Sequence, residues 1–370
     1  MHDLAQPDPP VQPNRRRRWI VRGCLILFAL FLCACGFVTW TLIPDRGSVA
    51  HGARRIFEGG RNLSGVAWVD ENHLVIAENL YISILDLKPR RLRHVWGDKK
   101  AMHFATSPRA MRRGSGFGFQ AVSASPTRCV LVTCDNADYP DPQTVRIRPG
   151  LCARQAWTFG PTPDRAAITG IRFPYDRGLP FFAVGDINLR TGWCKLRRGG
   201  HLSPRSLCSC DDGRNLYVLS CPPAATSPRL CRYDPESAEI RTIRDLGFDR
   251  EIPLCIEGRP HDATTIGLVS THAGRRGRWG ARIANRAVKI AHRIDRRIPV
   301  AYVGEYLTNL RESDHTLRFH LLDSATGKVR RTIALGRGYC DEDPAFSWSP
   351  DGTRIAYILN GNVYVLGIPK

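Results

Sequence analysis

The most compact group of carboxylates in this 370-residue chain is the run Asp341, Glu342 and Asp343. Carboxylate oxygens are the ligands that hard cations such as Ca²⁺ prefer, so the run is a candidate cation site. An acidic run in a loop is also commonly just solvated, which is the simpler interpretation. The ten histidines that follow residue 43 are scattered and do not have the spacing of metal ligands.

The sequence motifs of several large enzyme classes are absent. There is no Gly-x-Ser-x-Gly nucleophile elbow, no His-Glu-x-x-His zinc motif, and no Walker or dinucleotide-binding fingerprint. The sequence therefore predicts no catalytic residue and no cofactor.

The thirteen cysteines are the next residues that could form covalent bonds or bind a metal. Three of them lie in an apolar run near the N-terminus, and the remaining ten are an even number, which permits disulfides in an oxidising compartment. Cys208 and Cys210 are two apart in a strand-like run, so both point to the same face and cannot easily bridge each other. We expect several cysteines to be small buried residues, and Cys221 with Cys231 is the first pair to test for a bridge.

A large share of the positive charge after residue 43 lies in residues 276–298, where apolar and basic residues each recur every three or four positions. This spacing predicts an amphipathic helix with two distinct faces. One hypothesis places it on an anionic membrane surface or on a partner, through Trp279, Ile283, Arg282, Arg286, Lys289 and Arg293. The simpler interpretation, which we prefer, is that the apolar stripe covers the adjoining fold and the arginines are solvated. A third option divides the same residues into two strands.

Most of the chain after residue 43 consists of short β-type runs separated by polar turns. Three stretches share one pattern of short strand, tight turn and more apolar strand: Val66–Leu87, Leu207–Cys221 and Phe346–Ile368. In the last of them, Pro350 presets the backbone of the turn and Gly352 accepts a positive φ.

Four-strand units of about 40–55 residues indicate a β-propeller. We expect an all-β propeller of about six blades, or seven if residues 276–298 form strands. The chain ends in a third strand at Asn362–Val365, whereas Ala53–Phe57 resembles a fourth strand that lacks the first three. The N-terminal strand is therefore predicted to complete the last blade, which would leave no open edge at the junction.

The last repeat resembles the WD40-like repeat of TolB and its relatives. The resemblance covers about 25 residues and rests on Pro344, Trp348, Ser349, Pro350, Asp351, Gly352, Ile355, Ala356 and Tyr357. It implies a propeller of the kind found in extracytoplasmic binding proteins, some of which are attached to peptidases. The chain differs from them in carrying an apolar N-terminal segment of its own.

That segment, residues 23–43, has no charged residue and follows four consecutive arginines. Twenty-one residues make a helix of about 31 Å, enough to cross a bilayer core. We expect a disordered basic cytoplasmic tail at 1–22, a transmembrane helix at 23–43 and an extracytoplasmic propeller at 44–370. A lipoprotein signal with Cys35 as the lipidated residue, a cleaved signal peptide and a twin-arginine signal are the alternatives.

The net charge is +20, from 54 basic and 34 acidic residues. Most of the basic residues are arginines, as in chains encoded by GC-rich codons, so the charge by itself is weak support for an anionic partner. The sequence predicts a membrane-anchored binding or scaffold module for a protein, a peptide or an envelope polymer, with no nucleic-acid partner. The alternative is a propeller-type hydrolase or lyase that uses a cation in the central channel.

Overall fold

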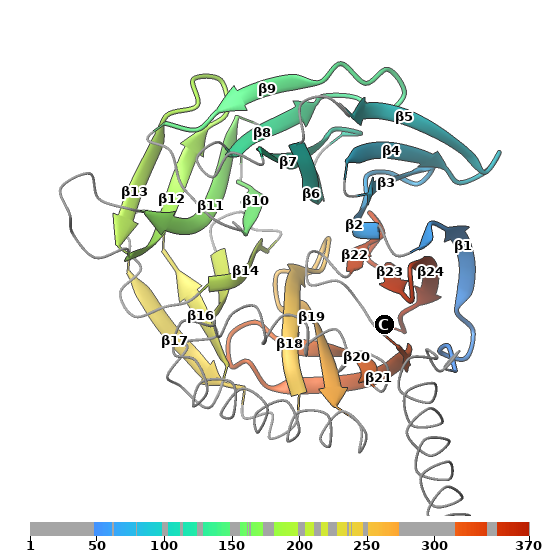
Figure 1. Ribbon diagram of the computed structural model, residues 1–370. Helices are drawn as coiled ribbons and strands as arrows, with labels where there is room; N and C mark the ends of the chain where they lie inside the picture. Colours follow the sequence, from blue (N-terminus) through green and yellow to red (C-terminus); the bar gives the residue numbers. More distant parts are fainter. Residues whose placement is uncertain are drawn as a thin grey trace, which may run out of the picture. The chain divides into compact units, whose positions relative to one another are not determined.

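A computed structural model describes the fold of the propeller region. It covers residues 48–60, 63–78, 80–97, 103–111, 114–123, 129–148, 156–160, 162, 164–172, 181–198, 204–210, 216–220, 228–234, 237, 239–246, 251–273, 315–338 and 346–369. These residues form six four-stranded antiparallel sheets arranged as the blades of a propeller (Figure 1). The predicted all-β class and the six-blade count are confirmed, and the seven-blade alternative is wrong.

Each of the first three blades is built from four consecutive strands. Blade 1 contains β2 (Leu63–Trp68), β3 (His73–Glu78), β4 (Tyr81–Asp86) and β5 (Arg91–Gly97). Blade 2 contains β6 (His103–Ala110), β7 (Phe117–Ser123), β8 (Cys129–Cys134) and β9 (Gln143–Arg146). Blade 3 contains β10 (Trp157–Phe159), β11 (Arg165–Arg172), β12 (Phe181–Asn188) and β13 (Cys194–Arg198).

The other three blades follow the same order until the last. Blade 4 contains β14 (Pro204–Ser209), β15 (Leu216–Ser220), β16 (Arg229–Tyr233) and β17 (Ile240–Asp245). Blade 5 contains β18 (Glu251–Gly258), β19 (Thr265–Ala273), β20 (His315–Asp323) and β21 (Val329–Arg337). Blade 6 contains β22 (Phe346–Trp348), β23 (Arg354–Leu359), β24 (Asn362–Gly367) and, as its outer strand, β1 (Arg54–Glu58).

The ring closes through β1 as the sequence predicts. Arg54 pairs with Val365 and Glu58 pairs with Asn362 in an antiparallel register. The first strand of the propeller and the last one therefore share a sheet, and neither is left as the unpaired edge of an incomplete blade.

The turn at Ser349–Gly352 has the predicted chemistry. The Gly352 N–H donates to the Ser349 carbonyl at 2.8 Å, and Gly352 has φ of +65°. Asp351 accepts hydrogen bonds from the Ser349 hydroxyl and from the Thr353 N–H. Burial alone would raise the pKa of Asp351, but these hydrogen bonds lower it to about 2.

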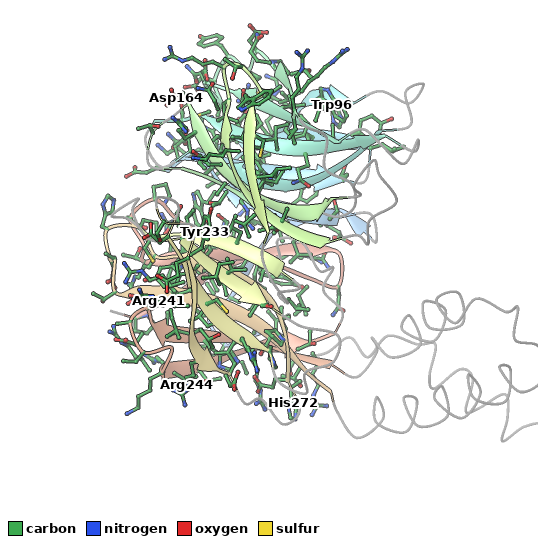
Figure 2. The ribbon with its side chains drawn as sticks, turned by 90° about the vertical axis from the view of Figure 1, so that its left-hand side faces the viewer. Trp96, Asp164, Tyr233, Arg241, Arg244 and His272 are labelled. Atoms are coloured by element: carbon green, nitrogen blue, oxygen red, sulfur yellow. The ribbon has the colours of Figure 1, made fainter. Side chains whose placement is uncertain are left out.

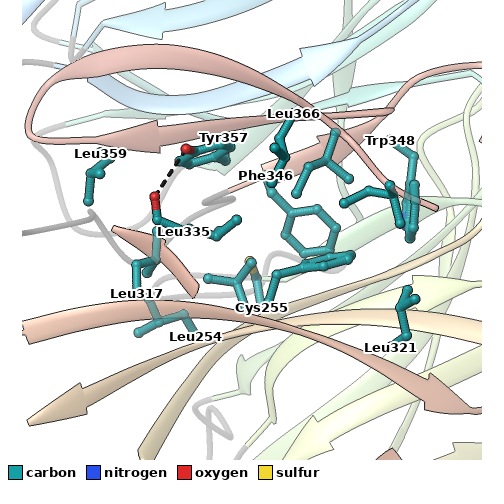
Figure 3. Packing of buried hydrophobic residues seen from close by; sticks show 14 residues of the cluster. Leu254, Cys255, Leu317, Leu321, Leu335, Phe346, Trp348, Tyr357, Leu359 and Leu366 are labelled. Atoms are coloured by element: carbon teal, nitrogen blue, oxygen red, sulfur yellow. Dashed lines mark hydrogen bonds between the residues drawn. The ribbon is translucent and has the colours of Figure 1, made fainter. Parts of the chain in front are cut away.

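Neighbouring blades are joined by apolar packing and by hydrogen bonds between inner strands. Between blades 5 and 6, Phe319 packs edge-on against Phe346 and Trp348 at ring distances of 5.2 and 5.4 Å. The Tyr357 hydroxyl donates to the Leu335 carbonyl at 3.1 Å across the same cluster (Figure 3). Between blades 6 and 1, the Trp68 N–H donates to Ser347 Oγ at 3.0 Å.

The propeller has two sides, which we name by residues that mark them. On the proximal side, Glu251 at the start of β18 pairs with His272 near the end of β19. Ser48 lies there too, because its carbonyl accepts a hydrogen bond from Arg337 at the end of β21. The distal side carries the turns near Asp164 and Tyr233. Figure 2 shows His272 toward the right and Asp164 and Tyr233 toward the left.

Residues 274–314 leave blade 5 and return to it on the proximal side, because Ala273 pairs directly with His315. The helix predicted at 276–298 lies outside the described residues, as do the tail at 1–22 and the transmembrane helix at 23–43. Within the described ranges no helix has both the length and the apolar composition needed to cross a bilayer.

Six cysteines in the described part of the chain are buried thiols that form no disulfide, as predicted for several of them: Cys134, Cys194, Cys208, Cys210, Cys231 and Cys255. Cys208 and Cys210 lie in one apolar cluster, which confirms the same-face prediction. Cys231 is fully buried on β16 as a thiol, so the bridge suggested for it is wrong, and Cys221 lies outside the described residues. Burial raises the pKa of Cys134 and of Cys194 to about 12.

Candidate functional site

A cavity with a volume of about 710 Å³ lies at the outer rim between blades 2 and 3. We call it the blade 2–3 groove. One wall comes from β8 and β9 and the residues just after β9, and the other from the turn between β12 and β13. The lining residues are Thr133, Gln143, Thr144, Val145, Arg146, Arg148, Leu189, Arg190, Thr191 and Gly192.

Backbone hydrogen bonds hold the two walls together. The Arg148 N–H donates to the Gly192 carbonyl at 2.8 Å, and the Cys194 N–H donates to the Arg148 carbonyl at 2.7 Å. The turn is anchored to the rest of blade 3, since the Leu189 N–H donates to the Asp164 carbonyl at 2.7 Å. The groove is therefore rigidly placed by strands of two different blades.

Gly192 is required by this geometry. It has φ of +72°, and a Cβ there would lie 2.0 Å from the Arg146 carbonyl oxygen. A residue with a side chain would have to push the walls of the groove apart, and it would also be strained in the left-handed region.

The groove is positively charged. Arg146, Arg148 and Arg190 are exposed, and no carboxylate is among the described residues that line it. Two acids lie close by. Asp141 accepts a hydrogen bond from Gln143 at 2.8 Å. The pKa of Asp164 is lowered chiefly by a hydrogen bond from Thr162, with smaller contributions from the charges of Arg190 and Arg165. Three guanidinium groups without a lining acid are suited to carboxylate or phosphate ligands.

Two large exposed aromatic side chains lie close in sequence to residues that line the groove. Trp193 follows Gly192 and is 65% exposed, and Tyr139 precedes β9 and is 85% exposed. A parallel backbone bridge joins Trp193 to Arg148, so the two residues are neighbours at the edge of the groove. Exposed aromatic residues beside arginines are typical of the energetic centre of protein interfaces.

A second polar group lies within blade 5, on the proximal side. The Glu251 carboxylate interacts with His320 Nε2 at 2.9 Å, accepts a hydrogen bond from the Ser270 hydroxyl at 2.9 Å and pairs with Arg318. Burial alone would raise the pKa of Glu251, but its contacts with His320, Ser270 and Arg318 lower it to about 2.

This Ser–His–Glu group does not have the geometry of a nucleophilic triad. In a triad the serine and the carboxylate occupy opposite nitrogens of the imidazole. Here Ser270 and Glu251 both contact Nε2, while Nδ1 of His320 lies 2.9 Å from the Thr332 hydroxyl. Ser270 and His320 are also buried. The group is therefore a structural network that crosses all four strands of blade 5.

A third polar group joins blades 1 and 2. Nδ1 of His73 lies 2.8 Å from Asp70, its Nε2 lies 3.4 Å from Asp138, and Arg93 pairs with Asp86 at 2.9 Å. Among the described residues, no three His, Cys, Asp or Glu side chains have an arrangement that could hold a metal ion.

None of the site residues predicted from the sequence lies in these groups. The candidate cation ligands Asp341, Glu342 and Asp343 fall outside the described residues, and so does the basic surface predicted at 276–298. The groove was not predicted, because Arg146 and Arg148 on one side and Arg190 on the other belong to different blades. The short Arg-x-Arg spacing after β9 is the one local signal for it.

No family profile matches this chain, and no curated protein matches it in sequence. Solved structures do match. A protein assigned as TolB from Agrobacterium tumefaciens is 16% identical with a TM-score of 0.51, and the match covers 85% of this chain and 91% of that one. The hydrazine synthase of Kuenenia stuttgartiensis is 12% identical with a TM-score of 0.51, over 83% of this chain and 77% of that one. These likenesses show the propeller fold alone.

Proposed function

We propose that this chain is a membrane-anchored, extracytoplasmic propeller that binds an acidic segment of a partner protein in the blade 2–3 groove. The observation that carries the proposal is the set of three exposed arginines, Arg146, Arg148 and Arg190, on a rigid groove whose described lining has no carboxylate. The fold, a TolB-like propeller, is the scaffold that presents the groove.

One observation favours a protein segment over an envelope polymer. Tryptophan, tyrosine and arginine are enriched among the residues that dominate protein interfaces, and the exposed Trp193 is joined to Arg148 by a backbone bridge. The aspartates and glutamates of such a segment can pair with the guanidinium groups through two parallel hydrogen bonds.

The membrane anchor is part of this proposal and rests on the apolar run at 23–43. Residues 44–47 separate that run from Ser48, which is bonded to Arg337 on the proximal side. In this proposal the anchor is joined through these residues to Ser48, which lies on the proximal side of the propeller.

The basic helix predicted at 276–298 joins blade 5 on the same proximal side, through Ala273 and His315. Its attachment there is compatible with a position over the propeller and with a position on the membrane surface, so both hypotheses stay predictions. Binding of the full chain to anionic liposomes, compared with a Trp279→Asp and Ile283→Asp variant, separates them.

The enzyme alternative depends on a cation in the central channel, held by Asp341, Glu342 and Asp343. No group among the described residues supports that alternative. It would gain support from a divalent cation that raises the thermal stability of the chain and loses this effect when the three acids are changed to Asn or Gln.

The binding proposal is tested with the full-length chain in detergent micelles. A fluorescent decaglutamate peptide should bind, and the affinity should fall steeply as the salt concentration rises, because exposed charge pairs are screened over about 10 Å at 0.1 M salt. A polygalacturonate fragment of equal charge serves as the polymer probe. Stronger binding of the fragment than of the peptide would contradict a protein partner, and no binding of either would contradict the groove itself.

A further inference from the structure

A second cavity lies on the junction between blades 6 and 1, where β1 closes the ring. It has a volume of about 170 Å³ and is lined by residues of β1, β2, β4, β23 and β24 and of the turn after β4. This is roughly ten times the space that one water molecule needs. Its character differs from that of the groove, because apolar residues make up half of its wall: Ile56, Leu85, Leu87 and Val365.

The rest of the lining is Trp68 and three arginines, Arg54, Arg90 and Arg354. No carboxylate is among the described residues that line this cavity. The Arg354 guanidinium lies 4.9 Å from the centre of the Trp68 ring. Asp351 is close enough to Arg354 to interact electrostatically, but its carboxylate already accepts hydrogen bonds from Ser349 and Thr353. The cavity therefore concentrates positive charge against an apolar wall.

Trp68 completes the wall and is only 2% exposed. Its indole Nε1 is enclosed by the protein and is not open to the cavity. The ring carries the Arg354 guanidinium over its face, so Trp68 helps to position this charge at the cavity.

We propose that this cavity binds a compact carboxylate with an apolar body. The carboxylate pairs with the arginines, while the apolar body packs on Ile56, Leu87 and Val365. A bare inorganic anion would leave the apolar wall unfilled, and a neutral apolar molecule would leave the arginines unpaired. A free branched-chain acid and the C-terminus of a peptide that ends in leucine both present this chemistry.

Such a ligand would touch the two strands that close the ring, β1 and β24, and also the neighbouring blade 1. Arg54 and Ile56 belong to β1 and Val365 to β24, all in blade 6, whereas Trp68, Leu85 and Leu87 belong to blade 1. A ligand that binds only the closed ring raises the unfolding temperature as its concentration rises. This inference does not depend on the blade 2–3 groove, since the two cavities share no residue.

The test uses the full-length chain in detergent, with calorimetric titration and thermal unfolding as readouts. The probes are 4-methylpentanoate, its neutral amide, inorganic phosphate, and the peptide Gly-Gly-Leu with a free or an amidated C-terminus. We expect saturable binding and a rise in unfolding temperature with 4-methylpentanoate or with the free peptide. Binding of only one of them identifies the source of the carboxylate. Equal binding of the amide or of phosphate, or no binding of either carboxylate, would overturn the proposal.

Two variants make the assignment specific. The first variant combines Arg54→Gln with Arg90→Asn and removes two charges, so it should weaken binding at least about ten-fold. Asn is chosen at position 90 because Arg90 has φ of +51°, a left-handed conformation that Asn tolerates. Trp68→Phe leaves a smaller ring beneath the Arg354 guanidinium, which should hold this charge less well at the cavity and so weaken binding. Arg91→Gln, on the same hairpin but outside the lining, is the control. Unchanged binding in both test variants would overturn the site.

Discussion

Arg54, in the first strand of the propeller, pairs with Val365 in the last one, so a single sheet holds both ends of the ring. Every other blade is made of four strands that follow one another in the chain. The closure of the ring should therefore depend on contacts within blade 6 and on the apolar cluster that blade 6 shares with blade 1.

Val363 tests this dependence. It is 0% exposed on β24 and packs in the cluster that joins blades 6 and 1. Val363→Ala should lower the free energy of unfolding by about 2 kcal/mol, since two buried methyl groups are lost and a cavity is left. Urea denaturation measures the effect. The matched control is Val329→Ala on β21, where the valine is 36% exposed and the loss should be below about 0.5 kcal/mol. Equal losses would contradict the account.

Glu251 should make stability depend on pH in the acid range. Its folded-state pKa is lowered from 4.5 to about 2 by contacts with His320, Ser270 and Arg318, which outweigh the opposing effect of burial. The ionised carboxylate therefore stabilises the fold above about pH 4.5, and this contribution is lost as the pH falls toward 2.

Removing the Glu251 side chain measures this contribution. Glu251→Ala should cost about 3–5 kcal/mol at pH 7, because His320 and Arg318 lose their partner. The difference in free energy of unfolding between this variant and the wild type should become smaller as the pH is lowered from 4.5 toward 2. Glu71→Ala, at an exposed position, is the control and should change little. A difference that stays constant over this pH range would show that the charge of Glu251 is not what stabilises blade 5.

Gly192 should matter more than other glycines of the same backbone conformation. Gly192 and Gly114 have φ of +72° and +85°, but a Cβ at Gly114 would have nothing within 4 Å. Gly114→Ala should cost about 1–2 kcal/mol for the left-handed conformation alone. Gly192→Ala should cost clearly more and should also weaken binding of decaglutamate. Thermal unfolding and the peptide titration check both effects, and equal behaviour of the two variants would argue against the wall geometry.

The buried cysteines should be unreactive in the native protein. Burial raises the pKa of Cys134 and Cys194 to about 12, so their thiolate forms are scarce at neutral pH. Iodoacetamide treatment followed by peptide mapping should leave both unlabelled in buffer and label both in guanidinium chloride. Labelling of either thiol within minutes in the native state would contradict its position in the core.

The fold could be predicted from the sequence because local features determine it. The Ser349–Gly352 turn follows from its proline and glycine, and the unmatched strands at the two ends imply the closure. The course of blade 5 was harder to predict. Its strands β19 and β20 are direct neighbours although residues 274–314 separate them, and no local pattern reports that pairing.

The candidate sites could not be predicted because they form between blades. Arg148 meets Gly192 only when blades 2 and 3 stand side by side. Trp68 and Arg354 are at opposite ends of the propeller sequence and meet only through ring closure. Packing between blades also explains the wrong prediction for Cys231. Its place beside a loop suggested a disulfide, whereas its side chain is enclosed in an apolar cluster between blades 3 and 4.

The most direct test of the proposed function is the affinity of decaglutamate for two triple variants of the full-length chain. The groove variant removes the three lining arginines through Arg146→Ala, Arg148→Ala and Arg190→Ala. The control variant removes three exposed arginines elsewhere, through Arg91→Ala, Arg232→Ala and Arg331→Ala, and so changes the net charge equally. The account predicts that the groove variant binds at least about ten-fold more weakly than the wild type, while the control stays within about two-fold. Equal weakening of both variants would mean that the peptide senses only the overall charge, and would contradict the groove as the binding site.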